Sequence, residues 1–136
     1  MRGDKLEQNP AQYVFNYKSV ENLENAQIKT RRILHLTLKK KWFDFIKTGE
    51  KKLEYREDKP YWRKRLLDDK GFPKMFDIVR FRNGYAKNSP VVDVEFKSIL
   101  CLNKRWLEPQ HGEVLPENVF AIHLGKVLNA DSINRD

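Results

Sequence analysis

The sequence predicts one α+β domain built on a small mixed β-barrel of about five to six strands, with short helices packed against it. Five stretches alternate between apolar and polar residues, as half-buried strands do, and two helical segments fall in the first half of the chain. The order strand–helix–strand–helix–strand–strand–strand differs from the regular βαβ alternation of a doubly wound fold. Closing the sheet into a barrel would protect its edges, and 136 residues are enough to bury one such core.

The first predicted strand and helix come directly after residue 31. Residues 32–38 alternate in polarity, which predicts a strand with one buried face. Residues 39–48 change to helical spacing, with Trp42 and Ile46 on the apolar side. Gly49 stands where a left-handed helix stop is expected.

The second predicted strand, residues 51–57, holds the densest group of charges in the chain. Its alternation places Leu53 and Tyr55 on one face, which we expect to be the core side, and Glu54 and Arg56 on the other.

The remaining predicted elements follow Pro60, a residue that suits the first turn of a helix. They are a short helix over 61–67, a strand over 76–82 that leads into an Asn83–Gly84 turn, a strand from 92 to about 100, a loop or irregular helix over 103–118, and a strand over 119–124. We therefore expect an N-terminal extension at residues 1–30, flexible or packed across the domain, the domain itself at 31–128, and a C-terminal tail at 129–136.

The positive charge of the chain is concentrated in one window. Residues 31–67 hold 13 Lys and Arg against 5 Asp and Glu, a net charge of +8, while the remaining 14 Lys and Arg are balanced by 14 Asp and Glu. A concentrated basic surface is typical of nucleic-acid-binding proteins, although a solvated basic face without a partner has the same composition.

Other sequence features concern location and cofactors. The sequence contains no stretch of about 18 apolar residues, the length that would predict a membrane span. The first residues lack the apolar centre of a signal peptide, and the single Cys101 cannot form an internal disulfide, which favours a cytoplasmic or nuclear location. His35, His111 and His123 are too far apart to indicate a metal site, and His123, in an apolar strand, is expected in the core. We predict no metal and no cofactor.

The motif Gly49-x-Lys51-x-x-Glu54-x-Arg56 resembles the G-x-K-x-x-E-x-R signature of ASCH domains, relatives of the PUA fold of RNA-binding proteins. The helix before the motif, the basic helix after it and the later stretches 79–85 and 120–125 follow the order of that family. The resemblance covers residues 31–128 and implies a PUA-like β-barrel with a cleft lined by the motif and the basic helix.

ASCH domains are generally proposed to bind RNA, so the resemblance implies a basic cleft that holds a base, nucleoside or nucleotide. The alternative is a small hydrolase of the same fold. One group of the family hydrolyses N4-acetylcytidine with a lysine, a threonine three residues later and a downstream glutamate, and other members are assigned ribonuclease activity. Lys51 matches the lysine, Glu54 stands at the position of the threonine, and the sequence assigns no downstream glutamate.

Several roles stay open for the motif residues. Lys51 and Glu54 are the candidate catalytic pair, an amine beside a carboxylate, and the alternatives are ligand contact without chemistry and a salt bridge. Arg56 suits a phosphate or the edge of a base, or an ion pair with Glu54.

The other candidate ligand-binding residues are aromatic, cationic or placed at the turn. Tyr61 and Tyr85 are candidates for stacking on a base, whereas Trp62 is assigned to the core. Arg82 ends a strand where side chains often reach a cleft, and Asn83 makes a ligand contact or only supplies the turn conformation. The candidate phosphate contacts are Lys39, Lys40, Lys41, Arg63, Lys64 and Arg65.

Overall fold

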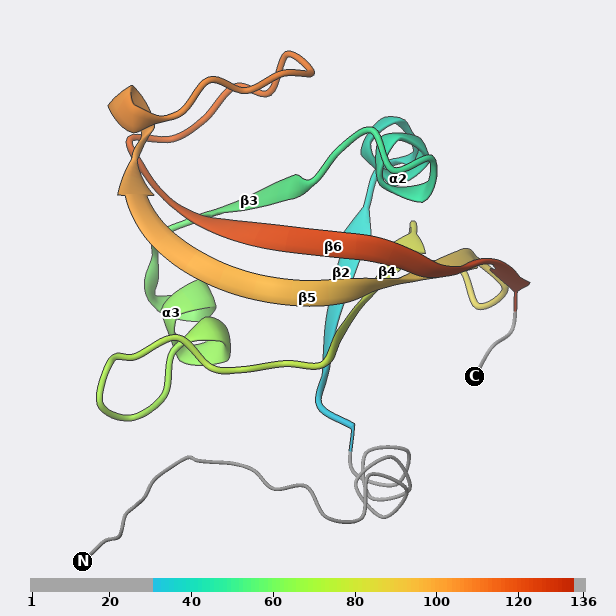
Figure 1. Cartoon of the computed structure of the whole chain (residues 1–136), viewed down its shortest axis with the longest axis horizontal. Helices are drawn as coiled ribbons and strands as arrows, with labels where there is room; N and C mark the ends of the chain where they lie inside the picture. The colour runs from blue at the N-terminus through green and yellow to red at the C-terminus, as the bar shows by residue number, and fades with distance from the viewer. Residues whose placement is uncertain (1–30, 134–136) are drawn as a thin grey trace, which may run out of the picture. The chain divides into compact units, whose positions relative to one another are not determined.

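The computed structural model describes residues 31–133, so the predicted N-terminal extension lies outside the described residues. Within this range, five strands form one mixed sheet in the order β2–β4–β5–β6–β3 (Figure 1). The elements are β2 (Ile33–Leu38), α2 (Lys40–Lys47), β3 (Leu53–Glu57), α3 (Pro60–Leu66), β4 (Ile78–Asn83), β5 (Pro90–Asn103) and β6 (Asn118–Ile133). The predicted class, a small mixed barrel-like sheet with short helices, is confirmed.

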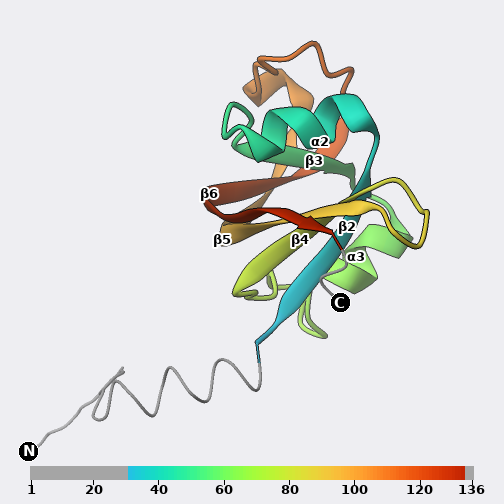
Figure 2. The same cartoon turned by 90° about the vertical axis from the view of Figure 1, so that its right-hand side faces the viewer.

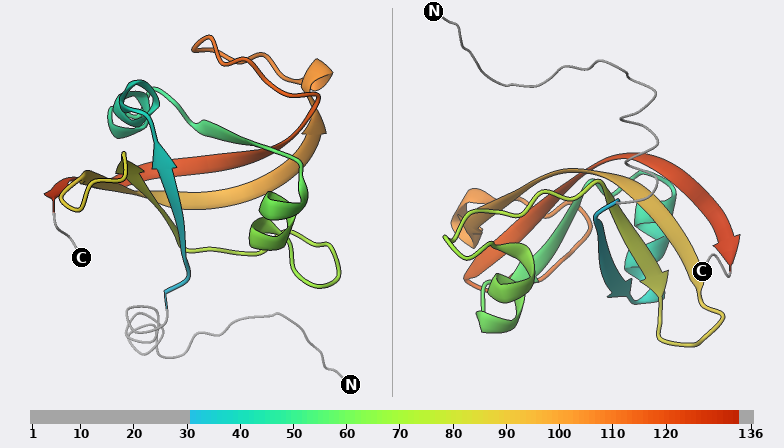
Figure 3. Two further views of the ribbon diagram at one scale, coloured as in Figure 1. Left: turned by 180° about the vertical axis from the view of Figure 1, so that it is seen from behind. Right: turned by 90° about the horizontal axis from the view of Figure 1, so that it is seen from below.

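The two longest strands, β5 and β6, form the curled centre of the sheet (Figure 3). They pair antiparallel from Pro90 opposite Ile133 to Asn103 opposite Asn118, with register shifts between Val91 and Ser98. Such irregularities increase the local twist and bend of a ribbon, which lets the sheet wrap around a core. The last strand continues beyond residue 128, where we expected the domain to end, because its end is held by pairing with the start of β5.

The curled sheet has two edges, β2 and β3. The first pairs in parallel with β4 and the second antiparallel with β6, and among residues 31–133 no strand ladder joins the two edges. Two arginines bridge the opening instead: Arg56 Nη2 donates to the carbonyl of Thr37 at 3.4 Å, and Arg65 Nη2 to that of His35 at 3.0 Å. The ring of Trp62 on α3 lies 4.9 Å from the guanidinium of Arg56 and 5.3 Å from that of Arg65. The sheet is therefore a half-barrel closed by side chains.

The hydrophobic core fills the inside of this curl. Phe81 of β4, Phe120 of β6 and Ile46 of α2 are all fully buried there. Trp62 packs against the same core while it also contacts the two arginines. None of the helices in the described part is long and apolar enough to cross a membrane.

Glycines mark two of the predicted turns. Gly49 has a φ of 84°, and its N–H donates to the carbonyl of Ile46, so the predicted helix stop is confirmed. Gly84, with a φ of 86°, follows the end of β4 and opens a longer loop that reaches Ser89. The undecided stretch between β5 and β6 begins with a short 3₁₀ turn, Lys104–Trp106, and continues as a loop over residues 107–117.

Candidate functional site

Strand β3 places Glu54 and Arg56 on the inner face of the sheet. Glu54 and Arg56 are paired in register with core residues of β6, and directly paired residues of antiparallel strands share a face. Glu54 is buried, whereas Leu53 and Tyr55 are only half-buried. The prediction that Leu53 and Tyr55 face the core is wrong, because at this end of the half-barrel the interior holds a charged cluster and not close-packed apolar side chains.

Lys51 lies just before this strand and is 3% exposed. The left-handed stop at Gly49 turns the chain back along α2, and the Lys51 N–H donates to the carbonyl of Phe45 at 3.0 Å. The turn at Gly49 and this hydrogen bond thus hold the backbone of Lys51 against the end of α2, and its side chain is buried in the half-barrel.

The ammonium group of Lys51 is surrounded by carboxylates and aromatic rings. It forms an ion pair and hydrogen bond with Glu113, and lies 3.7 Å from Oε1 of Glu54. The ring centres of Trp42 and Tyr55 lie 5.3 Å and 5.0 Å away. A buried ammonium is costly unless it is paired, and these four groups offset that cost.

Arg56 extends the cluster toward the open side of the sheet. Its Nη2 lies 2.8 Å from Oε2 of Glu54, so the ion pair considered from the sequence is present. The same nitrogen donates to the carbonyl of Thr37, while the buried Nε–H has no acceptor among the residues that the structure describes.

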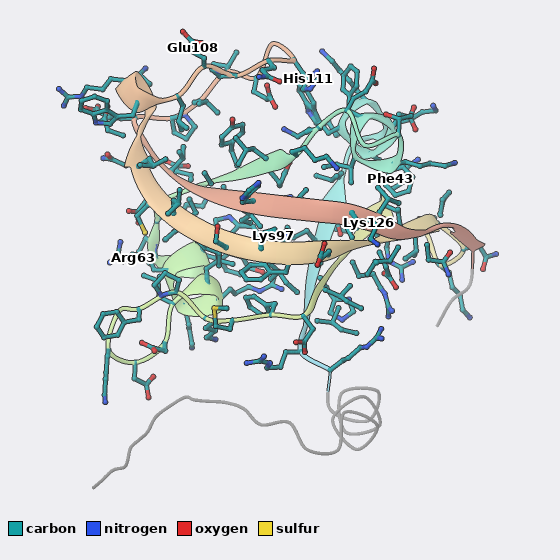
Figure 4. The ribbon with its side chains drawn as sticks, in the orientation of Figure 1. Phe43, Arg63, Lys97, Glu108, His111 and Lys126 are labelled. Carbon is teal, nitrogen blue, oxygen red and sulfur yellow. The ribbon has the colours of Figure 1, made fainter. Side chains whose placement is uncertain are left out.

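Glu113 is the site residue that the sequence did not identify. It lies in the 107–117 loop, which is fixed to α2 by His111 (Figure 4): the imidazole ring stacks on Phe45 at 4.4 Å, and its Nε2 lies 3.2 Å from the carbonyl oxygen of Glu50. The His111 backbone N–H also donates to Glu113 Oε1 at 3.1 Å. Gly112, with a φ of 81°, makes the turn between the two residues.

The two carboxyl groups beside Lys51 have pKa values shifted in opposite directions. Burial raises the pKa of Glu54, against the opposing effect of the Arg56 and Lys51 charges, and the negative charge of Glu113 adds to the rise. Burial alone would also raise the pKa of Glu113, but the hydrogen bond and charge of Lys51, with backbone N–H donors, hold it below its ordinary value. Burial and both carboxylates raise the pKa of Tyr55. Two carboxyl groups whose pKa values are pushed apart are suited to different roles in proton transfer.

A cavity of about 370 Å³ opens beside the cluster. Its walls come from α2, β3 and the loop, and include Trp42, Lys51, Glu54, Tyr55, Arg56 and the 112–116 segment. This volume is at the lower end of the range for small-molecule sites. The structure therefore brings together the three motif residues named from the sequence and adds Glu113 and the two aromatic rings.

The predicted phosphate contacts on α2 lie outside this cavity. Lys39, Lys40 and Lys41 are exposed at the start of the helix, where Lys40 pairs with Asp44 at 2.6 Å and Lys41 lies 4.6 Å from the ring centre of Trp42.

The candidates on α3 lie across the sheet from the loop in the view of Figure 4, which labels Arg63 beside that helix. Arg63 pairs with Asp58 at 2.8 Å, Arg65 donates to the carbonyl of His35 at the sheet edge, and Lys64 is exposed. Tyr61 is 57% exposed, and its ring meets that of Trp62 edge-on.

The last candidates stand at the end of β4. Arg82 and Asn83 are paired with the end of β2, and Tyr85 is 90% exposed on the following loop. None of the three lines the 370 Å³ cavity.

The histidines are used in ways that the sequence did not indicate. His123 is exposed, so its predicted core position is wrong: it lies opposite Leu53 and Ser98, on the face of the sheet away from the core. It lines a second cavity of about 420 Å³. Within residues 31–133, no group of three or more His, Cys, Asp or Glu is placed to hold a metal ion.

Comparison with known proteins found a likeness in fold. No family model and no curated protein matches the sequence. A matching solved structure is the crystal structure of a single-residue mutant of ZmASCH from Zymomonas mobilis, with a TM-score of 0.47 and 15% sequence identity, over 73% of this chain and 75% of that chain.

Proposed function

We propose that the cavity between α2, β3 and the 107–117 loop binds a nucleobase, presented as a nucleoside, a nucleotide or an unpaired residue of RNA. The observation that supports this most is the buried Lys51 ammonium, held between two carboxylates under two aromatic rings at the wall of a 370 Å³ cavity.

The charge balance of the cavity favours an uncharged ligand. Lys51 and Arg56 are matched by Glu54 and Glu113 when both carboxyl groups are ionised, and in that state no positive charge is left over for a phosphate. A nucleobase is planar and presents both donors and acceptors along its edge. The carboxylates can accept from its donors, and the guanidinium of Arg56, which lines the cavity, can donate to one of its acceptors.

Stacking supplies the second part of the affinity. The rings of Trp42 and Tyr55 line the cavity, and stacking of one base on an aromatic side chain contributes about 1–3 kcal/mol in single-strand binding. If the base belongs to RNA, the exposed lysines at the start of α2 are placed outside the cavity, where they can contact flanking phosphates.

The test compares Lys51→Gln with Lys47→Gln, an exposed lysine of the same helix region. Binding of nucleosides and of short single-stranded RNA is measured by isothermal titration calorimetry. Lys51→Gln should weaken nucleoside binding about tenfold or more, because one hydrogen bond from a charged group contributes about 1.5–3 kcal/mol, whereas Lys47→Gln should bind like the parent. Unchanged affinity in folded Lys51→Gln protein would exclude this cavity. For RNA, four phosphate contacts predict a log–log salt slope of about −3.

A second candidate function, hydrolysis of an N-acylated nucleoside, is favoured by the opposite pKa shifts of the two carboxyl groups. Glu113, kept ionised, would take a proton from a water molecule that attacks the amide carbonyl. Lys51 would stabilise the negative charge that develops on the carbonyl oxygen, and Glu54, in its protonated form, would donate a proton to the leaving amine. The products are a carboxylic acid and the free nucleoside.

This candidate supplies the downstream glutamate that the resemblance implies, and it uses Glu54 where that group has threonine. The test is incubation with N4-acetylcytidine and, separately, with single-stranded RNA, each with and without a chelator, followed by product analysis. Glu113→Gln should lower turnover of the acetylated nucleoside about 100-fold or more, while the protein still binds it. If folded parent protein yields no product from either substrate, hydrolysis is excluded for these substrates and only the proposed binding function remains.

A further inference from the structure

We propose that the second cavity is a phosphate subsite, so that the natural ligand is a nucleotide whose base lies in the first cavity and whose phosphate lies in the second. This inference rests on the proposed function, since it names the ligand class of the same site.

The two cavities are adjacent and share part of their walls. The second cavity, of about 420 Å³, is lined by Lys51, Tyr55 and Glu113, which also line the first. The Lys51–Glu113 ion pair and Tyr55 therefore belong to the walls of both spaces. A ligand that extends over both cavities has room for more than one base, and a nucleotide has two chemically different ends.

The two cavities differ in how their cations are paired. In the first, each cation has a carboxylate partner. The second contains Lys52, whose ammonium donates to the carbonyl of Gly125 at 3.1 Å and has no carboxylate within ion-pair distance among residues 31–133. Glu50 also lines this cavity, and its Oε1 accepts from the hydroxyl of Thr48 at 3.1 Å.

Other donors line the same cavity as Lys52. Gln110 and His123 belong to the wall of the second cavity, as does the imidazole of His111, while Leu53 and Leu100 give it an apolar side. Amide, imidazole and ammonium donors suit a phosphate, and the apolar side suits the carbon atoms of a ribose. These features assign the base to the cavity whose cations are both ion-paired, and the phosphate to the cavity that holds the Lys52 ammonium.

The phosphate could belong to a free nucleotide or to a phosphodiester of RNA, because both present the same anionic oxygens. The experiment therefore measures affinities for a nucleoside, its 5′- and 3′-monophosphates, and a trinucleotide of the same base. Each is titrated into the parent protein, Lys52→Gln and the control Lys47→Gln by isothermal titration calorimetry.

In the parent, we expect a phosphate-bearing ligand to bind about tenfold more tightly than the nucleoside, the gain of one charge-assisted hydrogen bond. Lys52→Gln should remove most of this gain without changing affinity for the nucleoside, which also shows that the variant is folded. Lys47→Gln should keep the gain. If a monophosphate binds more tightly than the nucleoside, a free nucleotide is sufficient to fill the subsite. If only the trinucleotide binds more tightly, the subsite binds a phosphodiester of RNA.

Two results would overturn the phosphate subsite while leaving the proposed function intact: equal affinity of the parent for nucleoside and all phosphorylated ligands, or a full gain in Lys52→Gln. If the folded parent binds none of these ligands, the proposed function fails, and the subsite fails with it.

Discussion

Two charged clusters of the half-barrel differ in how their hydrogen-bond donors are paired with acceptors. On the face of the sheet away from the core, Arg80 donates two parallel hydrogen bonds to Asp93, of 2.7 Å from Nε and 2.9 Å from Nη2. In the cavity, Lys51 is shared by two carboxylates. Arg56 divides its donors between a carboxylate and a backbone carbonyl, and its buried Nε–H has no acceptor within residues 31–133.

We infer that this difference separates a structural ion pair from the proposed binding site. The bidentate pair joins neighbouring strands β4 and β5 and uses the carboxylate fully, which is the geometry that gives such pairs their strength. The cavity cluster, by contrast, lines a space large enough for a small ligand. We therefore expect loss of the first pair to reduce stability and loss of the second cluster to reduce binding.

The largest expected change in stability comes from Asp93→Ala. It leaves a partly buried guanidinium without its carboxylate and should lower the free energy of unfolding by about 2 kcal/mol, somewhat below the cost for a fully buried pair. Urea unfolding measures this loss at neutral pH, and nucleoside affinity should stay at the parent value. A folded Asp93→Ala protein that no longer binds nucleoside would contradict the separation of the two clusters.

The double variant with Lys51→Met and Glu113→Met reverses this pattern. Replacing both members of a buried ion pair by apolar side chains is often neutral or stabilising, so the free energy of unfolding should stay within about 1 kcal/mol of the parent or rise. Nucleoside affinity should nevertheless fall more than tenfold. A large loss of stability would show that this ion pair, like Arg80–Asp93, is mainly structural.

The two carboxyl groups of the cavity should affect stability in different pH ranges. The pKa of Glu54 is raised in the folded state, so its contribution is full below the ordinary value of about 4.5 and is lost as pH rises through the folded-state pKa. The pKa of Glu113 is lowered, so its contribution is present above about 4.5 and is lost as pH falls through the folded-state pKa.

Urea unfolding from acid to neutral pH measures both effects as differences from single variants. Relative to Glu54→Gln, the parent should lose stability as pH rises above about 4.5. Relative to Glu113→Gln, it should lose stability as pH falls below about 4.5. Two differences with the same sign of slope would show that the cavity does not separate the two groups.

The sequence predicted the local parts of the site because they are encoded by short-range patterns. Helical spacing and Gly49 predict where α2 ends, and the motif names Lys51, Glu54 and Arg56, which the structure brings together. The face that Glu54 occupies was assigned wrongly, because alternation separates two faces of a strand without saying which is inside. Here the buried face carries charges, against the usual rule.

Glu113 could not be chosen from the sequence for a different reason. It comes from a loop without periodicity, 62 residues after Lys51, and Glu95, Glu108 and Glu117 are equally downstream. The signal that singles it out is the preceding His-Gly pair: His111 fixes the loop to Phe45, and the left-handed Gly112 turns the chain so that Glu113 reaches the ammonium. Only the folded chain shows that Phe45 and His111 are neighbours.

The smallest expected effect tests whether the loop turn serves the cavity. Gly112 and Gly71 both have left-handed φ angles, 81° and 87°, and an added Cβ would meet no atom within 4 Å at either position. Substitution by alanine should therefore cost about 1 kcal/mol of stability in both cases, through backbone strain alone. Because Gly112 precedes Glu113, Gly112→Ala should also weaken nucleoside binding a few-fold, whereas Gly71→Ala, in the loop after α3, should not. Urea unfolding and calorimetric titration give the two quantities for each variant. Equal nucleoside affinities in the two variants would mean that Glu113 tolerates displacement, and the site would then depend on β3 and α2 without the loop.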